Sequence, residues 1–307
     1  MEFSHIPVML EECLEGLRID PEGVYVDGTA GGAGHSREIA RRLTAGRLIA
    51  LDQDPDAVAI ARERLSPFPC AQVIHTNFRN MSAALTQAGV EGADGVLLDL
   101  GVSSHQLDTA ERGFSYLKDA PLDMRMAQEG ISAADLVASA PEEELARILW
   151  EYGEERYSRS IARAIVRQRE KEPIQTTLQL AEVIKSAMPA AAKRDKNPCK
   201  RSFQALRIAV NSELDALSQG IDEAFSILNP GGRLVIITFH SLEDRMVKQK
   251  FAELCRGCTC PPEFPVCVCG KKPRARLISK KPILPSEEEL SHNRRSQSAK
   301  LRIIEKL

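Results

Sequence analysis

The chain has 307 residues, which is long enough for one large or two smaller domains with buried cores. Charged residues make up 27% and aromatic residues 5%, as in an ordinary soluble protein. No apolar run approaches the length of a membrane-spanning helix, and residues 1–5 have neither the basic nor the apolar part of a signal peptide. We therefore expect a cytoplasmic protein with no membrane partner.

The net charge of −2 conceals an asymmetry along the chain. Residues 1–187 contain 19 Lys and Arg against 30 Asp and Glu, whereas residues 188–307 contain 22 against 13. A basic part on a nearly neutral protein favours a polyanionic partner that contacts one side of the molecule. Charge balancing between the two parts is the alternative.

The first motif is a glycine-rich loop between an expected strand and an expected helix. The apolar run 24–26 ends at Asp27, four glycines follow within seven residues, and a helical pattern covers 36–43. This order is typical of a doubly wound sheet that binds a nucleotide-like ligand, because glycine lets the ligand approach the backbone. A second apolar run, 48–51, ends at Asp52, where an acid can accept hydrogen bonds from two ribose hydroxyls. An ordinary tight turn followed by a surface acid is the alternative.

Alternating strands and helices continue to residue 99 and predict a parallel sheet. Strands are expected at 24–27, 47–51, 72–75 and 95–98, with helices between them. Right-handed crossovers bring the carboxyl ends of such strands to one edge of the sheet. Asp27, Asp52 and Asp99 each end a strand, so we expect them at one crevice.

Residues 106–205 interrupt this alternation with loop and helical patterns alone. We expect a helical insertion, so that residues 1–105 and 206–307 form one discontinuous α/β domain. A helix expected from Glu155 carries arginines in one narrow stripe: Arg156, Arg159, Arg163 and Arg167. The stripe is either a solvated helix face or a surface that contacts RNA phosphates.

The remaining elements complete the sheet. One long helix is expected over 203–228, and the β-rich run 233–239 predicts a central fifth strand. His240 follows this strand. Its side chain is expected to cap the next helix, and a role facing the substrate is the less favoured alternative. Further strands are expected at 277–279 and 300–304, with a short helix starting at Ser286 between them.

Two cofactors fit a doubly wound sheet with an acid after its second strand, a nicotinamide dinucleotide and S-adenosylmethionine. The glycines at 28, 31, 32 and 34 do not match the dinucleotide fingerprint G-x-G-x-x-G. Asp27 precedes the loop, where a carboxylate repels a pyrophosphate but can pair with a methionyl ammonium group. The residues therefore favour S-adenosylmethionine.

At the level of whole motifs, the sequence resembles the bacterial 16S ribosomal RNA cytosine-N4 methyltransferases of the MraW type. The resemblance runs from His5 to the C-terminus. The segments that carry it are His5-x-Pro-Val-Met-Leu, Asp27-Gly-Thr-Ala-Gly-Gly-Ala-Gly-His-Ser, Leu51-Asp-Gln-Asp-Pro, Leu98-Asp-Leu-Gly-Val-Ser-Ser-His-Gln-Leu-Asp, Arg112-Gly-Phe-Ser, Pro121-Leu-Asp-Met-Arg-Met, Tyr152-Gly-Glu-Glu-Arg, Phe203-Gln-Ala-Leu-Arg-Ile-Ala-Val-Asn-x-Glu-Leu and Phe239-His-Ser-Leu-Glu-Asp-Arg.

The resemblance implies a class I methyltransferase fold with a helical, substrate-binding insertion. It also implies methylation of one cytidine amine in the decoding region of 16S rRNA, with the 30S subunit as the expected partner. The cofactor-binding residues that it implies are Ala33, Gly34, His35, Asp52 at the ribose, Phe78 at the adenine, and Asp99 and Gln106 near the methyl-donating end.

Catalysis on a cytosine amine requires a hydrogen-bond acceptor, because the nitrogen lone pair is delocalised into the ring. Asp99, or a carbonyl group in 99–103, is the expected acceptor, and Asp99 and Ser103 are the candidate catalytic residues. The Asp99-Leu100-Gly101-Val102 run lacks the Pro-Pro-aromatic part of other amino methyltransferases, so a base-stacking side chain is not identified here. The target base must be extruded to reach the site. A methyltransferase for another amine and a non-catalytic ribosome assembly factor are the alternatives.

Five of the eight cysteines lie within fifteen residues: Cys255, Cys258, Cys260, Cys267 and Cys269. A disulfide framework is not expected without a secretory signal. The spacing permits a structural zinc site next to a basic run that contains Lys271, Lys272 and Arg274, which are candidate RNA contacts. Free thiols are the alternative, and the resemblance implies that the chemistry needs no metal.

Overall fold

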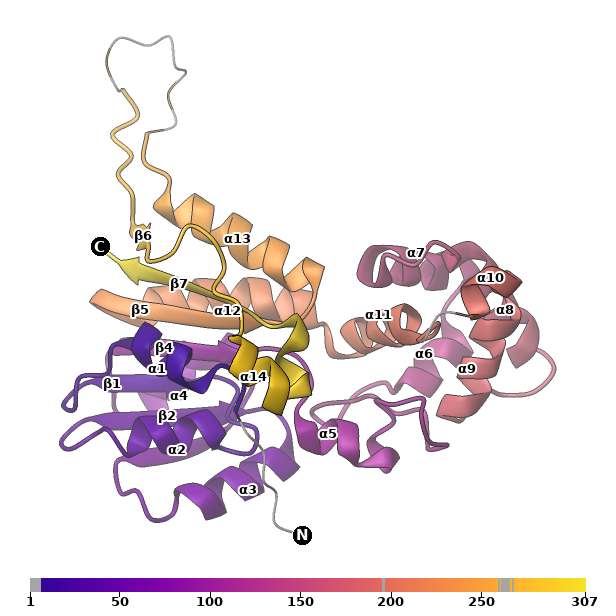
Figure 1. Ribbon diagram of the computed structural model, residues 1–307, viewed down its shortest axis with the longest axis horizontal. Coiled ribbons are helices and arrows are strands. Elements are labelled where there is room, and N and C mark those ends of the chain that lie inside the picture. Colours follow the sequence, from indigo (N-terminus) through magenta and orange to yellow (C-terminus); the bar gives the residue numbers. More distant parts are fainter. Residues whose placement is uncertain (1–6, 195–196, 259, 261–265, 267) are drawn as a thin grey trace. The chain divides into compact units, whose positions relative to one another are not determined.

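The computed structural model describes residues 7–194, 197–258, 260, 266 and 268–307 (Figure 1). The chain divides into two compact units, Met1–Gly101 with Leu214–Leu307 and Val102–Glu213. The second unit therefore begins slightly before and ends slightly after the predicted insertion, 106–205. Among the described residues, no helix is both long and apolar enough to cross a membrane.

The first unit is built on a seven-stranded sheet with the order β3-β2-β1-β4-β5-β7-β6 (Figure 1). Adjacent strands among β1 to β5 pair in parallel, whereas β7 is antiparallel to both β5 and β6. The strands are β1 Val24–Asp27, β2 Arg47–Asp52, β3 Ala71–His75, β4 Ala93–Asp99, β5 Leu228–Thr238, β6 Ala275–Leu277 and β7 Lys300–Lys306. The predicted α/β sheet is confirmed, although β6 lies two residues earlier than the strand expected at 277–279.

Both faces of the sheet are covered, because successive strand residues point to opposite sides and both sets are apolar. In β1, Tyr25 packs with α1, α2 and α3, while Val26 packs with α4, α12 and α13. The helices of this unit are α1 Leu10–Leu17, α2 Gly34–Ala40, α3 Pro55–Leu65, α4 Met81–Gln87, α12 Glu213–Ile227, α13 Ser241–Cys255 and α14 Glu287–His292. Two-sided burial fixes the register of the central strands, since a slip by one residue would exchange the two cores.

The long helix expected over 203–228 is wrong, because the structure contains two helices there. α11, Lys200–Asn211, ends at Ser212, whose backbone is left-handed with φ of 49°. The Asn211 side chain donates to Met124 O and accepts from Met126 N, each at 2.7 Å, so it is fixed by another segment at the break. Asn and Ser are weak helix formers that compete for such bonds, and they outweigh the continuous apolar pattern.

The second unit is helical, as predicted, and the residues described in it form no named strand. Its core contains Leu145, Ile161, Leu180 and Phe203, one from each of α7, α8, α9 and α11. The helices are α5 Ser104–Asp108, α6 Ala133–Ser139, α7 Glu142–Gly153, α8 Ser158–Arg169, α9 Thr177–Ser186, α10 Ala190–Lys193 and α11 Lys200–Asn211. The unit thus buries an apolar core of its own, separate from the cores of the sheet.

Candidate active site

The glycine loop lies where the strand order reverses, between β1 and β4, which is the usual ligand position in a doubly wound sheet. Its backbone is tied to both neighbouring strands: Gly28 N donates to Leu97 O at 2.9 Å and Ala30 N donates to Leu51 O at 2.8 Å. A Cβ atom at Gly28 would lie 2.5 Å from Leu98 Cδ2. Glycine is therefore required for this close approach between loop and sheet.

Asp27 is buried at the end of β1 and organises the loop that follows it. One carboxylate oxygen accepts from Thr29 N at 3.1 Å and the other accepts from the Ser36 hydroxyl at 2.6 Å. Burial raises the pKa of this carboxyl above its usual range. Each oxygen of Asp27 thus has a partner within the chain, one in the loop and one in α2, whereas the ammonium partner suggested by the sequence stays a prediction.

Ala33, Gly34 and His35 form the turn from the loop into α2. Ala33 is left-handed, with φ of 59°, and a Cβ atom at Gly34 would lie 2.5 Å from Pro7 Cγ. The His35 ring is buried, with Nε2 3.0 Å from Val8 O, so Nε2 carries a proton and donates. Burial lowers the pKa of His35 to about 4, so the ring is neutral at pH 7 and Nδ1 is unprotonated.

Asp52 at the end of β2 holds two backbone amides. Its Oδ2 accepts from Gly31 N at 2.8 Å and its Oδ1 accepts from Asp54 N at 2.9 Å. Burial raises the pKa of Asp52 to about 6, against the effect of these two hydrogen bonds. Each oxygen keeps a second acceptor position, as a carboxylate that receives a pair of ribose hydroxyls requires.

Asp99 at the end of β4 lies beside the loop. Its backbone N donates to the Thr29 hydroxyl at 2.7 Å, and its Oδ2 is 3.8 Å from His35 Nδ1. The buried Oδ1 has no hydrogen-bond partner among the described residues. Burial, followed by the charges of Asp27 and Glu243, raises the pKa of Asp99 to about 8. A buried acceptor without a partner indicates a place where a ligand binds.

Phe78 follows β3 and packs against α12. A Cβ atom at Gly220 would lie 2.3 Å from Phe78 Cδ2, so the ring lies directly on the helix backbone. A Cβ atom at Gly28 would come within 3.1 Å of Phe78 Cβ, which places the residue beside the glycine loop. One side of the ring is thus fixed by the helix, and the side chain is partly buried.

Ser103 and Gln106 belong to the second unit, where they form a capping box on α5. Ser103 Oγ accepts from Gln106 N at 3.2 Å, and Gln106 Oε1 accepts from Ser103 N at 3.0 Å. Both side chains therefore already have a structural role at the start of this helix. Their roles in catalysis and cofactor binding stay predictions.

His240 begins α13 as predicted, as a cap. Its side chain accepts from Glu243 N, and Glu243 Oε2 accepts from Phe239 N at 2.8 Å and His240 N at 3.3 Å. The reciprocal bonds fix the chain direction after β5, and the buried Glu243 contributes to the raised pKa of Asp99.

Three further residues hold the loop and were not identified from the sequence. The Thr29 hydroxyl connects the loop to β4, the Ser36 hydroxyl connects Asp27 to α2, and Arg64 Nη1 donates to Gly32 O at 2.7 Å from α3. Thr29 and Ser36 lie within the motif, so the presence of a hydroxyl beside a buried carboxylate was an available signal. No sequence signal indicated Arg64, because its contact with Gly32 O depends on how α3 packs against the loop.

These features fit S-adenosylmethionine. The crevice edge of the first unit combines a glycine-rich loop, the Asp52 carboxylate at the end of β2, the Phe78 ring beside the loop, and a buried acceptor without a partner in the described chain. A pyrophosphate would meet the carboxylates of Asp27 and Asp99 here, which disfavours a dinucleotide.

Three of the four predicted arginines, Arg156, Arg159 and Arg163, line an open hollow of about 870 Å³ between α7 and α8, and Arg167 does not. α8 begins at Ser158, so Arg156 precedes the helix and the predicted four-residue helical stripe is wrong in this respect. All four arginines are exposed. The single tryptophan of the chain, Trp150, also lines the hollow and is 60% exposed, a feature that the sequence pattern did not indicate.

The basic run after the cysteines is only partly free. Arg274 lies over the Phe225 ring, with Cζ 4.9 Å from the ring centroid, so its guanidinium is anchored to the sheet unit. Lys271 and Lys272 are exposed and form no ion pair within the described part of the chain.

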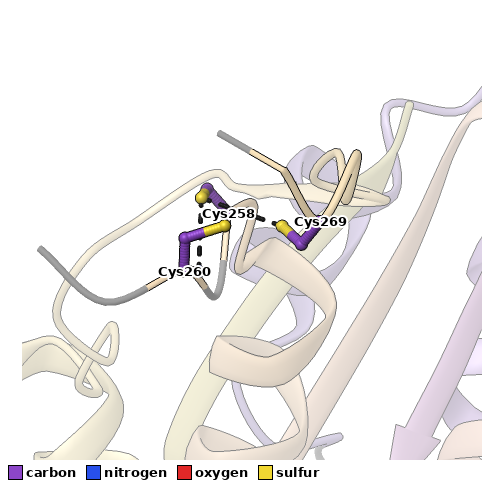
Figure 2. A group of neighbouring side chains, drawn as sticks. All are labelled: Cys258, Cys260 and Cys269. Atoms are coloured by element: carbon purple, nitrogen blue, oxygen red, sulfur yellow. Dashed lines mark hydrogen bonds between the residues drawn. The ribbon is translucent and has the colours of Figure 1, made fainter. Parts of the chain in front are cut away.

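Among the described cysteines, Cys258, Cys260 and Cys269 gather, with sulfur atoms within 4.8 Å of one another (Figure 2). Cys255 is not in this group, and Cys267 lies outside the described residues.

The chain is similar to known proteins over its full length. The chain is 55% identical to ribosomal RNA small subunit methyltransferase H of Brevibacillus brevis, over 100% of the chain and 99% of that protein. It is 54% identical to the protein of the same name from Clostridium botulinum strain Kyoto, over 100% of both. A crystal structure of an rRNA methylase from Streptococcus thermophilus is 12% identical with a TM-score of 0.43, and the match covers 97% of this chain and 93% of that one. The sequence profile of the MraW methylase family matches residues 2–307, and the chain belongs to this family.

Proposed function

We propose that this protein transfers a methyl group from S-adenosylmethionine to the exocyclic N4 amine of a cytidine in the decoding region of 16S rRNA, in the cytoplasm and on the 30S subunit. The names of its relatives support small-subunit rRNA as the substrate class. The observation that carries the chemistry is Asp99, a partly buried carboxyl group at the switch point whose buried Oδ1 has no partner in the described chain.

Asp99 serves as the acceptor for the substrate amine. An N–H group that donates to a carboxylate leaves its nitrogen closer to a pyramidal form, with the lone pair available for attack. S-adenosylmethionine supplies the methyl group on a sulfonium centre. The carboxylate must be ionised to act, and a pKa of about 8 places this ionisation close to the working pH.

The neighbouring residues hold Asp99 in place. Thr29 fixes its backbone to the loop, whereas the neutral His35 has an unprotonated nitrogen 3.8 Å from Oδ2 and gives the ionised carboxylate neither a hydrogen bond nor a counter-charge. Asp52 accepts from the ribose and Phe78 provides one wall for the adenine, while Ala33 and Gly34 form the turn into α2 beside the ligand. Gln106 and Ser103 are proposed at the methyl-transfer end. The reaction then depends on positioning and electrostatics.

The rRNA contacts are proposed for the second unit and for the basic run after the cysteines. The exposed arginines 156, 159, 163 and 167 can bind phosphates, and Trp150, which lines the same hollow as the first three, can stack a base. Lys271 and Lys272 are available for phosphates, whereas Arg274 is partly committed to Phe225. The basic 188–307 part of the chain agrees with such a partner.

The test is methyl transfer from labelled S-adenosylmethionine to purified 30S subunits that lack the modification, followed by nucleoside mass spectrometry. We expect N4-methylcytidine with the wild-type protein and a loss of about 100-fold or more in kcat for Asp99→Ala. Asp215→Ala, at an exposed acid of α12, is the control and keeps normal turnover.

The other outcomes separate the alternatives. Label in a different nucleoside would retain the cofactor and reject the cytosine specificity. Cofactor binding without transfer to any fraction would favour a non-catalytic assembly factor. Normal turnover of Asp99→Ala would remove Asp99 as the acceptor and leave a backbone carbonyl in 99–103 as its replacement.

A further inference from the structure

We infer that Cys258, Cys260 and Cys269 bind a zinc ion, in a site that lies beyond α13 and apart from the proposed methyl-transfer crevice. Their side chains converge from the two ends of the connection between α13 and β6 (Figure 2). The Sγ atoms of Cys258 and Cys269 are 3.8 Å apart, although eleven residues separate them in the sequence.

The distance between the Cys258 and Cys269 sulfur atoms is that of two ligands in a tetrahedral metal site, and the Cys260 sulfur lies within 4.8 Å of both. With Zn–S bonds of about 2.3 Å, the edge of a tetrahedron of sulfur ligands is about 3.8 Å long. A disulfide would require about 2.05 Å between two sulfur atoms and would leave the third cysteine unexplained. The 3.8 Å between the sulfur atoms of Cys258 and Cys269 is too long for a disulfide between these two residues. The three sulfur atoms therefore already lie at distances that a single ion can bridge.

Backbone amides are directed at the sulfur atoms, as they commonly are around thiolate ligands in metal sites. Cys260 N donates to Cys258 Sγ and Val268 N donates to Cys260 Sγ, each at 3.4 Å. A hydrogen bond to sulfur stabilises the thiolate form, which is the form that binds metal. Such contacts also fix the orientation of the ligands.

The described residues around the cluster bury little apolar surface. Val266 and Val268 are 69% and 73% exposed, so the apolar side chains nearest the cluster contribute no core. The described ends of the connection extend beyond α13 and β6, away from the sheet (Figure 1). A short segment without a core can be stabilised by a structural metal, whose binding free energy then becomes folding free energy. Thiolate ligands in a tetrahedral arrangement select zinc over harder cations such as magnesium.

A closed structural zinc site has four ligands. Cys255 and Cys267 are the remaining thiols of this segment, and serine variants at these two positions identify the fourth ligand. The ion would fix the position of Cys269, which directly precedes Gly270, Lys271 and Lys272 in the sequence. The two lysine charges would then have a defined position for binding phosphates. This consequence rests on the proposed RNA substrate, whereas metal binding does not.

The experiment measures metal in the full-length protein, purified under reducing conditions without added chelator. We expect elemental analysis to give one equivalent of zinc per wild-type chain. The variants Cys258→Ser, Cys260→Ser and Cys269→Ser should each contain well under half an equivalent. Cys70→Ser, at a thiol of the first unit outside this segment, is the matched control and keeps the full equivalent. Cobalt added in place of zinc should produce the visible bands of a tetrahedral thiolate complex.

A second measurement does not depend on the folding of the variants. Trypsin can cleave wild-type protein after Arg256 and Lys271, and zinc should protect these sites while a chelator exposes them. Zinc well under one equivalent in the wild-type protein, a disulfide in the reduced preparation, or unchanged cleavage with chelator would each overturn the inference. Loss of methyl transfer with zinc still bound would count against the proposed function alone.

Discussion

At the scale of single residues, Asp99 combines burial with a carboxylate that must ionise. Its pKa is about 8 in the folded chain against an ordinary value of 3.8, so between these pH values the folded state binds more protons than the unfolded state. The free energy of unfolding therefore falls as the pH rises through this window. The side chain of the Asp99→Asn variant cannot ionise, so its free energy of unfolding does not fall for this reason as the pH rises.

We expect Asp99→Asn to be more stable than the wild type by on the order of 2 kcal/mol at pH 9, and equally stable near pH 4. Thermal unfolding across this pH range provides the measurement, and the difference in Tm should grow with pH. Asp215→Asn on the exposed side of α12 serves as the control. A pH-independent difference would show that the carboxyl does not titrate as described.

Asp52 affects cofactor affinity more than the chemical step. Its two oxygens already accept from Gly31 N and Asp54 N, so Asp52→Asn can retain one of these bonds and loses an acceptor for the ribose. We expect KM for S-adenosylmethionine to rise about tenfold, as for the removal of one or two hydrogen bonds, with little change in kcat. Steady-state kinetics at saturating RNA would reveal a fall in kcat instead if Asp52 contacted the reacting atoms.

At the scale of elements, α12 supports the site through one glycine. Gly220 lies inside the helix, where alanine would ordinarily stabilise it by about 1 kcal/mol. Here the added Cβ would lie 2.3 Å from the Phe78 ring, and the clash outweighs the helix preference.

We therefore expect Gly220→Ala to lower the free energy of unfolding by about 1–3 kcal/mol and to weaken cofactor binding, because Phe78 must move. Gln219→Ala, one residue earlier on the exposed side of α12, should leave both properties unchanged. Chemical denaturation and cofactor titration give the two readouts. A more stable Gly220→Ala protein would mean that the ring moves aside without cost.

The elements that periodicity defines well could be predicted from the sequence. The buried strands β1, β2, β4 and β5 were found because they are continuous apolar runs that end in an acid or a cap. The division of the expected helix 203–228 was not found, because Asn211 forms its bonds with residues 124 and 126, far away in the sequence. Local pattern carries no information on such a partner.

The same contrast holds for the candidate site. Asp27, Asp52 and Asp99 were predicted to gather because parallel strands end at one edge, and their carboxyl groups lie around one loop. Arg64 and Trp150 were not identified, since their positions depend on the packing of helices and not on their neighbours in the chain. The positions of side chains along an edge follow from topology, whereas contacts between helices require the folded structure.

At the scale of the whole molecule, the proposed RNA surface has two physical components that can be measured separately. The arginines of α8 contribute charge, while the exposed indole of Trp150 contributes a stacking face. Acidic residues, Glu142 and Glu143, also line the hollow, and Arg163 pairs with Glu142 at 3.4 Å. An exposed pair of this kind is worth little, so phosphate can replace the carboxylate.

We expect replacement of Arg159, Arg163 and Arg167 by Gln to weaken binding to 30S subunits at low salt and to flatten its salt dependence. The slope of log K against log salt should fall by about 0.7–0.9 for each phosphate that the variant no longer neutralises. Trp150→Ala should reduce affinity by about 1–3 kcal/mol with an unchanged slope, because stacking releases no counterions. The control is the double variant Arg41→Gln and Arg42→Gln. These two arginines pair with Glu38 on the sheet unit, so the variant removes positive charge away from the hollow. An equal slope for the triple variant and the wild type would place the RNA elsewhere, and the basic part of the chain after residue 188 would then be the next surface to alter.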